Sequence, residues 1–188
     1  MKTLVLCGKT ATGKTTLAKA LEKHFGMRRM VTYTTRAPRP GEKDGVDYNF
    51  LTREEFDRRR SEGFFAETAD WNAKEGVRSY GSAAQDYKDP AAFAVLDPNG
   101  IRRLKEKGVP ITVILLEAED KVIEERLLRR GDSPEEIRKR KEIDSADFAG
   151  IDEFVDATLH VSSKSSLRAL CLAVVHTMAD CHGEERDG

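Results

Sequence analysis

The sequence has few cysteines, no excess of either charge and no long hydrophobic run. Cysteine occurs only at Cys7, Cys171 and Cys181 among 188 residues, an odd and scattered set that predicts no disulfide framework. We therefore expect a reducing, cytoplasmic compartment, with Cys7 and Cys171 as small buried hydrophobic side chains. Cys181 precedes His182 in a polar tail, where too few further ligands lie nearby for a metal site.

The longest apolar segments, such as Ile111–Leu116, are far too short to cross a bilayer. Near the N-terminus, residues 3–7 have the pattern of a strand and not that of a signal peptide. The 32 basic residues balance 33 acidic ones, so no global positive field is present to bind a nucleic-acid duplex. We therefore expect neither a membrane nor a nucleic acid as a partner.

Apolar residues make up 39% of the chain and gather in short runs, which suffices for one domain with an inserted lid. Runs typical of buried parallel strands alternate with the spacing of amphipathic helices. Strands are expected at 4–6, 91–97, 111–116 and 158–161, and helices at 17–25, 98–107, 120–130 and 167–178. The alternation predicts an α/β fold, in which a parallel central sheet carries helices on both faces.

Two segments interrupt this alternation. Residues 30–90 are rich in Thr, Arg, Gly and Tyr, with one short helix expected at about 52–63, and are typical of a substrate-binding insertion. Residues 129–147 are highly charged, which fits either a solvated helix face or a mobile lid that brings arginines to phosphates. The expected division is a core at 1–30 and 84–188, with a lid at about 126–147, and an insertion at 31–83.

Residues 8–15 read Gly-Lys-Thr-Ala-Thr-Gly-Lys-Thr and match G-x-x-x-x-G-K-[ST] at every fixed position. The motif follows a strand and opens a helix, where backbone N–H groups and the helix N-terminus bind phosphate. We expect Lys14 to be a solvent-facing, catalytic residue at the β- and γ-phosphates, and Thr15 to offer its hydroxyl to Mg²⁺. The residues expected to bind ATP are Gly8, Thr10, Ala11, Thr12, Gly13, Lys14, Thr15 and Thr16.

Asp97 follows the apolar run 93–96, so it is expected at the carboxyl edge of the sheet, where such folds bind ligands. There it is a candidate ligand of Mg²⁺ or of its waters, beside Thr15. The alternative role is a helix N-cap, because Pro98 follows at a natural first helical position. The two roles are compatible.

The insertion contains Arg36 and Arg39 on either side of Pro38, whose fixed φ stiffens the chain. Two guanidinium groups on a stiff loop are candidates to clamp a second phosphate, with Tyr48 and Tyr80 as uncharged donors. From these residues alone, two solvated loop arginines fit equally well.

The segment from Thr34 to Tyr48 contains T-T-R-x-P-R-x-G-E-x-x-G-x-D-Y without a departure, and it closely resembles the guanylate kinase family. An F-x-E-x-A run at 65–69, Y-G-S at 80–82 and R-x-x-x-R-G at 126–131 extend the resemblance over residues 2–178. The resemblance implies a three-layer P-loop NTPase fold with a small mixed NMP-binding insertion and a helical lid. The implied reaction is Mg²⁺- and ATP-dependent phosphorylation of GMP, and of dGMP, to GDP.

The resemblance also implies roles for individual residues. Glu67 and Ser82 would read the guanine, although Glu67 alternatively pairs with Arg36 or Arg39 in the empty pocket. The residues implied in GMP binding are Thr32, Arg36, Arg39, Tyr48, Glu67, Tyr80, Ser82, Asp97 and Asn99. Arg126, Arg130 and Arg140 would contact the transferring phosphates, and we expect all three to lie far from the phosphate loop without nucleotide. No general base is needed, because the GMP phosphate is already ionised.

The chain departs from the family pattern in four places. Asn99 stands where an aspartate usually touches the base, and residues 70–79 include extra ones, among them Lys74, Glu75 and Arg78. Thr32 and Tyr33 replace a more usual serine and hydroxyl-bearing residue, and 161–163 lacks the asparagine often found near adenine.

Three other functions remain alternatives. A GTPase lacks support because no N-K-x-D run is present. A related kinase that phosphorylates a ribose bisphosphate would not need Glu67 and Ser82 for a base. A non-catalytic guanylate-kinase-like binding module would have no use for an intact phosphate loop. The protein is expected to be a monomer or a homodimer.

Overall fold

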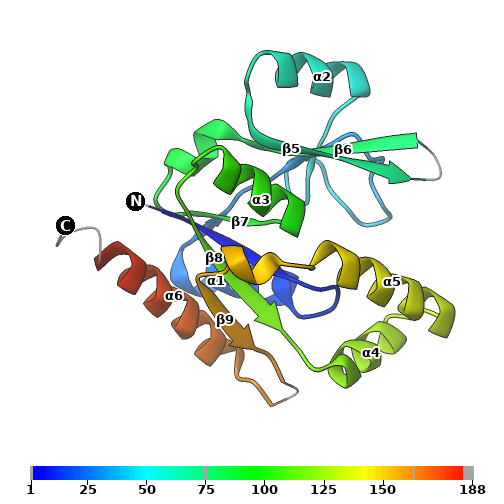
Figure 1. The fold of residues 1–188 in the computed structure, drawn as a ribbon, viewed down its shortest axis with the longest axis vertical. Helices are drawn as coiled ribbons and strands as arrows, with labels where there is room; N and C mark the ends of the chain where they lie inside the picture. Colours follow the sequence, from blue (N-terminus) through cyan, green and yellow to red (C-terminus); the bar gives the residue numbers. More distant parts are fainter. Residues whose placement is uncertain (1, 74–75, 163, 184–188) are drawn as a thin grey trace.

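The computed structural model describes residues 2–73, 76–162 and 164–183, which form two sheets and their covering helices (Figure 1). The strands are β1 Thr3–Gly8, β2 Arg28–Arg29, β3 Tyr33–Thr34, β4 Asn49–Phe50, β5 Phe65–Ala73, β6 Gly76–Ala83, β7 Ala92–Val95, β8 Ile111–Glu117 and β9 Ala157–His160. The α-helices are α1 Lys14–Phe25, α2 Arg53–Ser61, α3 Pro98–Glu106, α4 Asp120–Arg129, α5 Pro134–Asp147 and α6 Leu167–Gly183. Two short 3₁₀ helices are η1 Ala84–Lys88 and η2 Ile151–Phe154.

The larger sheet has the order β2-β7-β1-β8-β9, and every neighbouring pair is parallel. All six residues of the central strand β1 are buried, because parallel strands covered on both faces lie in the interior. This arrangement confirms the predicted parallel central sheet. The two-residue edge strand β2 was not predicted, because two arginines carry no strand signature.

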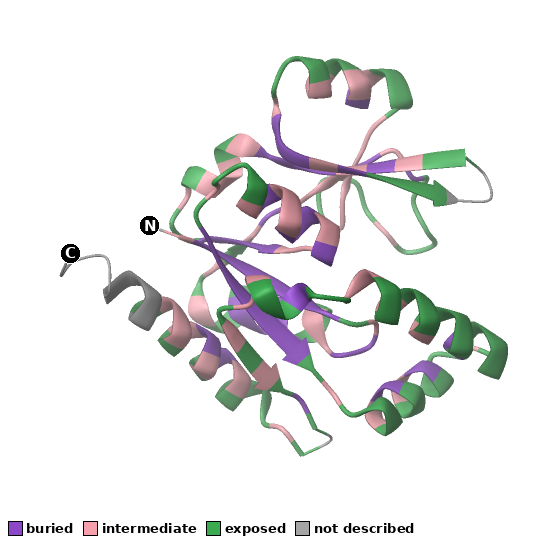
Figure 2. Cartoon of the chain, in the orientation of Figure 1, coloured by how far each residue is buried: buried purple, intermediate pink, exposed green. Residues whose placement is uncertain are grey.

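The core consists of two main layers, one on each face of this sheet (Figure 2). Leu17 of α1 and Val174 of α6 pack on one face, whereas Ile101 of α3 packs on the other. Cys7 and Cys171 are buried as predicted, and burial raises the pKa of the Cys7 thiol to about 12. The side chains of Cys181 and His182 lie outside the described part of the chain.

The smaller sheet has the order β4-β3-β6-β5 and contains both parallel and antiparallel pairs. The long β5–β6 hairpin forms its main part, and α2 covers it by stacking Phe56 on Phe65 with ring centroids 4.6 Å apart. Lys74 and Glu75 lie outside the described residues. The proposed domain boundaries at 31 and 83 stay a prediction, although all four strands of this sheet fall between them.

Helices α4 and α5 project from the end of β8 beside the phosphate loop (Figure 1). Ser133 begins α5 with a capping box, in which its hydroxyl and the Glu136 carboxylate bond each other's backbone N–H groups. Ile123 and Leu127 of α4 and Ile137 of α5 form a third apolar cluster with Ala11 of the phosphate loop. In the described part of the chain, no helix has the length and apolar character needed to cross a membrane.

Candidate functional site

The phosphate loop joins β1 to α1 and depends on glycine at its first position. A Cβ at Gly8 would lie 2.5 Å from the Leu116 carbonyl oxygen and 2.9 Å from the Thr12 hydroxyl, so the neighbouring strand excludes any side chain. Gly13 precedes the helix with a φ of +110°, which also favours glycine. Ala11 adopts a φ of +62°. Among the described residues it is the one residue other than glycine with a positive φ, a conformation that costs energy for a residue with a Cβ.

Lys14 bends back over this loop. Its ammonium group donates to the carbonyl oxygens of Gly8 at 2.5 Å and Lys9 at 2.8 Å. Burial is the main reason that its pKa lies below the usual value, and the carboxylate of Asp144 opposes that effect. Lys14 is therefore half-buried and not solvent-facing as expected, because the loop carbonyls draw its ammonium group inward.

Arg126 of α4 also contacts the loop. Its Nη1 donates to the carbonyl oxygens of Ala11 and Thr12 at 2.9 and 3.0 Å. We expected this arginine to lie far from the loop without nucleotide, and that expectation was wrong because two carbonyls already attract the guanidinium. Arg140 of α5 instead pairs with Asp132 at 3.2 Å.

Asp144 of α5 completes the surroundings of the loop. Its Oδ2 accepts the backbone N–H of Thr10 at 2.8 Å, and its Oδ1 accepts the Thr10 hydroxyl at 3.2 Å. Only the arginines of this segment were expected at the site. The available signal was the pair of carboxylates, Asp144 and Asp147, near the end of a helix that is otherwise rich in basic residues.

Two cavities flank the phosphate loop. One, of about 450 Å³, is lined by Gly13 and Thr16 together with the arginines Arg126, Arg129 and Arg130. Its positive lining makes it the better candidate for a triphosphate.

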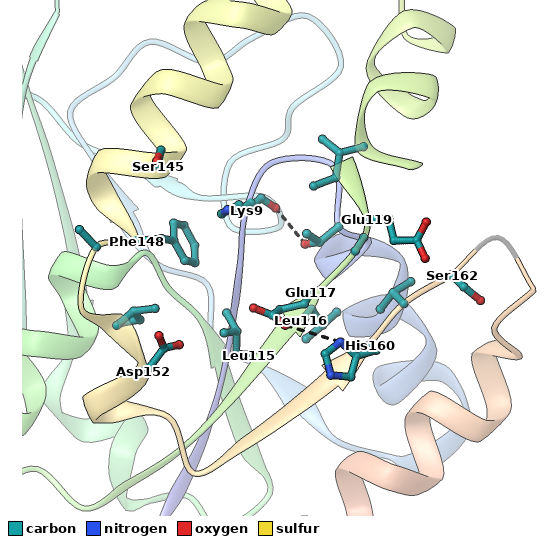
Figure 3. Close-up of a pocket in the computed structure, with 16 residues that line it drawn as sticks. Lys9, Leu115, Leu116, Glu117, Glu119, Ser145, Phe148, Asp152, His160 and Ser162 are labelled. Atoms are coloured by element: carbon teal, nitrogen blue, oxygen red, sulfur yellow. Dashed lines mark hydrogen bonds and ion pairs between the residues drawn. The ribbon is translucent and has the colours of Figure 1, made fainter. Parts of the chain in front are cut away.

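The other cavity, of about 560 Å³, lies between Lys9, the ends of β8 and β9, and the segment after α5 (Figure 3). There Glu117 pairs with His160 at 3.5 Å, and Glu119 and Asp152 add further carboxylates. These carboxylates would repel an anion, so this larger space is the poorer candidate.

A third cavity, of about 460 Å³, lies between the smaller sheet, the phosphate loop and α5. It brings together expected site residues from separate segments, namely Gly8, Thr10, Lys14, Thr32, Arg39, Tyr48, Glu67, Tyr80 and Asp97. Side chains with no predicted role also line it, among them Trp71, Asp144, Asp147 and Phe148. We refer to this space as the acceptor cavity.

Glu67 of β5 lines the acceptor cavity and is almost fully buried. Strand register places it opposite Ser82, whose hydroxyl donates to Glu67 Oε1 at 2.8 Å. Only 3% of Glu67 is exposed, and this desolvation raises the pKa of its carboxyl to about 7. Within the described residues Glu67 forms no ion pair with Arg36 or Arg39, so that alternative is wrong.

Arg36 and Arg39 occupy different environments. Arg36 is buried and makes two bonds of 2.9 Å to the Glu42 carboxylate, below the ring of Tyr48. The same carboxylate accepts the backbone N–H of Arg39 at 2.7 Å. Glu42 therefore holds the loop, and Arg39 lines the acceptor cavity. Arg36, Ser82 and Asn99 are not among the residues that line it, and Asn99 Oδ1 instead accepts from Arg102 at 3.2 Å.

Asp97 and Thr15 are the candidate ligands for Mg²⁺. Asp97 Oδ1 accepts the Gly100 N–H at 2.8 Å, which confirms the N-cap role, and Asp97 also lines the acceptor cavity. Thr15 is exposed in the first turn of α1 and lines an adjoining space that also touches Thr32 and Tyr48. A hydroxyl and a carboxylate are hard oxygen donors, so the pair fits Mg²⁺.

In the described chain, no group of three or more His, Cys, Asp or Glu side chains forms a complete metal site.

The guanylate kinase family model matches residues 1–163 of the chain. A guanylate kinase from Bifidobacterium longum is 36% identical over 168 residues, which cover 83% of this chain and 84% of the relative. Another from Mycobacterium leprae is 33% identical over 183 residues, covering 93% of this chain and 86% of that relative. The crystal structure of guanylate kinase from Anaplasma phagocytophilum shares the fold, with a TM-score of 0.68 and 22% identity over 95% of this chain and 85% of that chain. The chain therefore belongs to the guanylate kinase family.

Proposed function

We propose that this protein transfers the γ-phosphoryl group of ATP to GMP, and to dGMP, to give GDP or dGDP and ADP. One observation carries the proposal: Glu67, Tyr80 and Lys14 line the same cavity. A buried carboxylate, a phenol donor and the phosphate-loop lysine therefore face one space in which two nucleotides can meet. The relatives named guanylate kinase support the same substrate pair.

Guanine presents two adjacent donors, N1–H and the 2-amino group, and the carboxylate of Glu67 accepts both. Adenine presents a lone pair at N1, which would leave that buried carboxylate unsatisfied. Asn99 is also assigned to the guanine; its Oδ1 accepts from Arg102 at 3.2 Å and it does not line the cavity, so this contact requires the amide to turn toward the base. The phosphate of GMP is assigned to Thr32, Arg39, Tyr48 and Tyr80, with Arg36 supporting the loop from behind.

The triphosphate is assigned to the backbone N–H groups of the phosphate loop, to Lys14 and to the adjoining arginine-lined cavity. Catalysis then consists of alignment and neutralisation of charge that spreads during transfer. Arg126 and Arg130 are already next to the loop, and Arg140 would join them by movement of α5. Mg²⁺, held by Thr15 and Asp97, would supply further neutralisation of the phosphates.

A ribose bisphosphate kinase is the second candidate. The buried Glu67–Ser82 pair argues against it, because such an acceptor has no base to satisfy that carboxylate. The non-catalytic binding module has no use for Lys14 positioned over a complete phosphate loop. We propose the nucleotides ATP and GMP as partners, without a nucleic acid or a membrane, in the cytoplasm, with a monomer or a homodimer as the active form.

A coupled assay of ADP release tests the proposal directly. GMP, dGMP, AMP, UMP and a ribose bisphosphate serve as acceptors, each with Mg²⁺ and with excess EDTA. We expect Mg²⁺-dependent turnover of GMP and dGMP, with kcat/KM at least about 100-fold above that of AMP. Equal turnover of AMP, or preferential use of the ribose bisphosphate, would contradict the assignment.

A further inference from the structure

Ser82 is bonded on two sides by side chains that come from different elements. Its Oγ lies 2.8 Å from Glu67 Oε1 on β5 and 2.8 Å from the phenol oxygen of Tyr87 on η1. The ring of Tyr87 packs against the apolar layer that includes Val5 and Cys7, and its backbone carbonyl accepts the hydroxyl of Thr3 at 3.2 Å. Tyr87 is thus fixed from the core and reaches Glu67 only through Ser82.

The number of hydrogens in this row determines its direction. An ionised Glu67 only accepts, and the Ser82 hydroxyl has a single hydrogen, which it donates to that carboxylate. The bond between Ser82 and Tyr87 must then be donated by the phenol. Tyr87 therefore holds the Ser82 oxygen in place and leaves the serine hydrogen free to bond the carboxylate.

This direction matters when a base arrives. Once the N–H groups of a purine satisfy Glu67, the Ser82 hydrogen is released and can turn toward the purine 6-position. A 6-oxo group accepts that hydrogen, whereas a 6-amino group offers only another donor. The discrimination requires that the Ser82 oxygen keeps its place during the exchange, and the phenol of Tyr87 supplies that restraint.

We propose that Tyr87 is a positioning residue for base selection, which acts through Ser82 to direct its hydroxyl to a 6-oxopurine. The inference rests on the proposed GMP kinase function. Packing alone does not explain the phenol oxygen, because the ring fills its place in the apolar layer with or without a hydroxyl. The oxygen instead meets a side chain that is itself 1% exposed and bonded to the base-reading carboxylate.

The test is a double-mutant cycle with Tyr87→Phe, Ser82→Ala and the double variant. Loss of one neutral hydrogen bond predicts that Tyr87→Phe raises the KM for GMP by about three- to tenfold, with kcat and the KM for ATP unchanged. The same substitution should have no effect in the Ser82→Ala background, because its only route to the base is gone. Tyr33→Phe, which removes a phenol on β3 outside the acceptor cavity, is the control and should match the wild type.

A second substrate sharpens the cycle. 6-Thioguanosine monophosphate keeps N1–H and the 2-amino group but replaces the 6-oxo oxygen by sulfur, a weaker acceptor, so its KM should be less sensitive to Tyr87→Phe. The inference would be overturned if Tyr87→Phe changed the KM of both substrates equally, or if it changed the KM for GMP equally in the wild-type and Ser82→Ala backgrounds. Either result would leave the proposed GMP kinase activity intact. A wild-type protein that does not turn over GMP would overturn the proposed function and this inference together.

If Tyr87→Phe does not fold, ring-labelled tyrosine in the wild type provides the same test by NMR. Saturating GMP should shift the Tyr87 Cζ resonance in the wild type and leave it in place in Ser82→Ala. An equal shift in the two proteins would overturn the role of Ser82 as the link.

Discussion

The carboxylate of Asp144 bonds the backbone N–H and the hydroxyl of Thr10, at 2.8 and 3.2 Å, across 134 positions of sequence. A side chain of α5 thus uses one of the phosphate-loop N–H groups that we assign to the triphosphate. The Asp144 carboxylate binds the loop as a phosphate oxygen would, because both groups are anionic hydrogen-bond acceptors. ATP must therefore displace Asp144 from Thr10 when it binds.

We predict that Asp144→Ala tightens the binding of MgATP. A charge-assisted hydrogen bond and the repulsion between the carboxylate and the phosphates both disappear, so the Kd should fall by about three- to tenfold. Isothermal titration calorimetry without acceptor measures the change. Glu135→Ala is the control, because Glu135 lies on the same helix and pairs with the exposed Lys139. Unchanged or weaker ATP binding in Asp144→Ala would show that the contact does not compete with the nucleotide.

Lys14→Met should abolish most of the activity. It keeps the aliphatic stem but removes the ammonium group from the transferring phosphates, so kcat should fall by about 100-fold or more. The lost bonds to the Gly8 and Lys9 carbonyls should also lower the unfolding free energy by about 1 kcal/mol. Lys23→Met, at an exposed site on the same helix, controls for the loss of a charge. GMP-dependent ADP release near the wild-type rate would contradict the role of Lys14.

Recognition of GMP should depend on pH through Glu67. Desolvation is the main cause that raises the pKa of its carboxyl to about 7, and Asp97 acts in the same direction against Ser82, Arg103 and Lys107. Because only the carboxylate accepts both guanine donors, kcat/KM for GMP should fall as the pH decreases below about 7. Glu67→Gln should have low activity without this acidic limb. A flat wild-type profile between pH 6 and 8 would exclude Glu67 as the titrating base reader.

Glu67 should also lower the unfolding free energy of the protein at high pH. Its folded pKa of about 7 exceeds the value of 4.5 expected in the unfolded chain, so the fold retains a proton that the unfolded chain releases. The unfolding free energy should therefore decrease as the pH rises from 4.5 through 7. At pH 8 Glu67→Gln should be more stable than the wild type by up to about 3 kcal/mol, with little difference at pH 4. Urea denaturation at both pH values measures this, and an equal difference at the two would contradict it.

Much of the fold follows from local pattern. The phosphate motif predicts a strand before Gly8 and a helix after Gly13, because phosphate binding needs both, and the structure has β1 and α1 there. The run from Ile111 to Leu116 predicts a buried strand by its β-branched and apolar residues, and it forms β8. Such signals lie within single segments, so no knowledge of distant contacts is needed.

The arrangement of the site follows less completely from sequence. The motif that contains Arg36 and Arg39 also contains Glu42, but spacing alone does not show that Glu42 engages Arg36 and leaves Arg39 at the cavity. The contact between Asp144 and Thr10 depends on how α4 and α5 pack on the loop. These are pairings between segments, and the single sequence carries no signal that selects one partner over another.

Basic side chains on and just after α3 connect it to two walls of the acceptor cavity. Arg102 donates to two backbone carbonyls where α5 ends, while Arg103 and Lys107 donate to carbonyls of β5, the strand that carries Glu67. The α3 segment is thus hydrogen-bonded both to β5 and to the C-terminal end of α5. Glu67 and the C-terminal end of α5 are consequently held in place on one side of the acceptor cavity. A change in the width of the cavity has to come from its other side, where the loop of Arg39, the strand positions Trp71 and Arg78, and Asp144 of α5 lie.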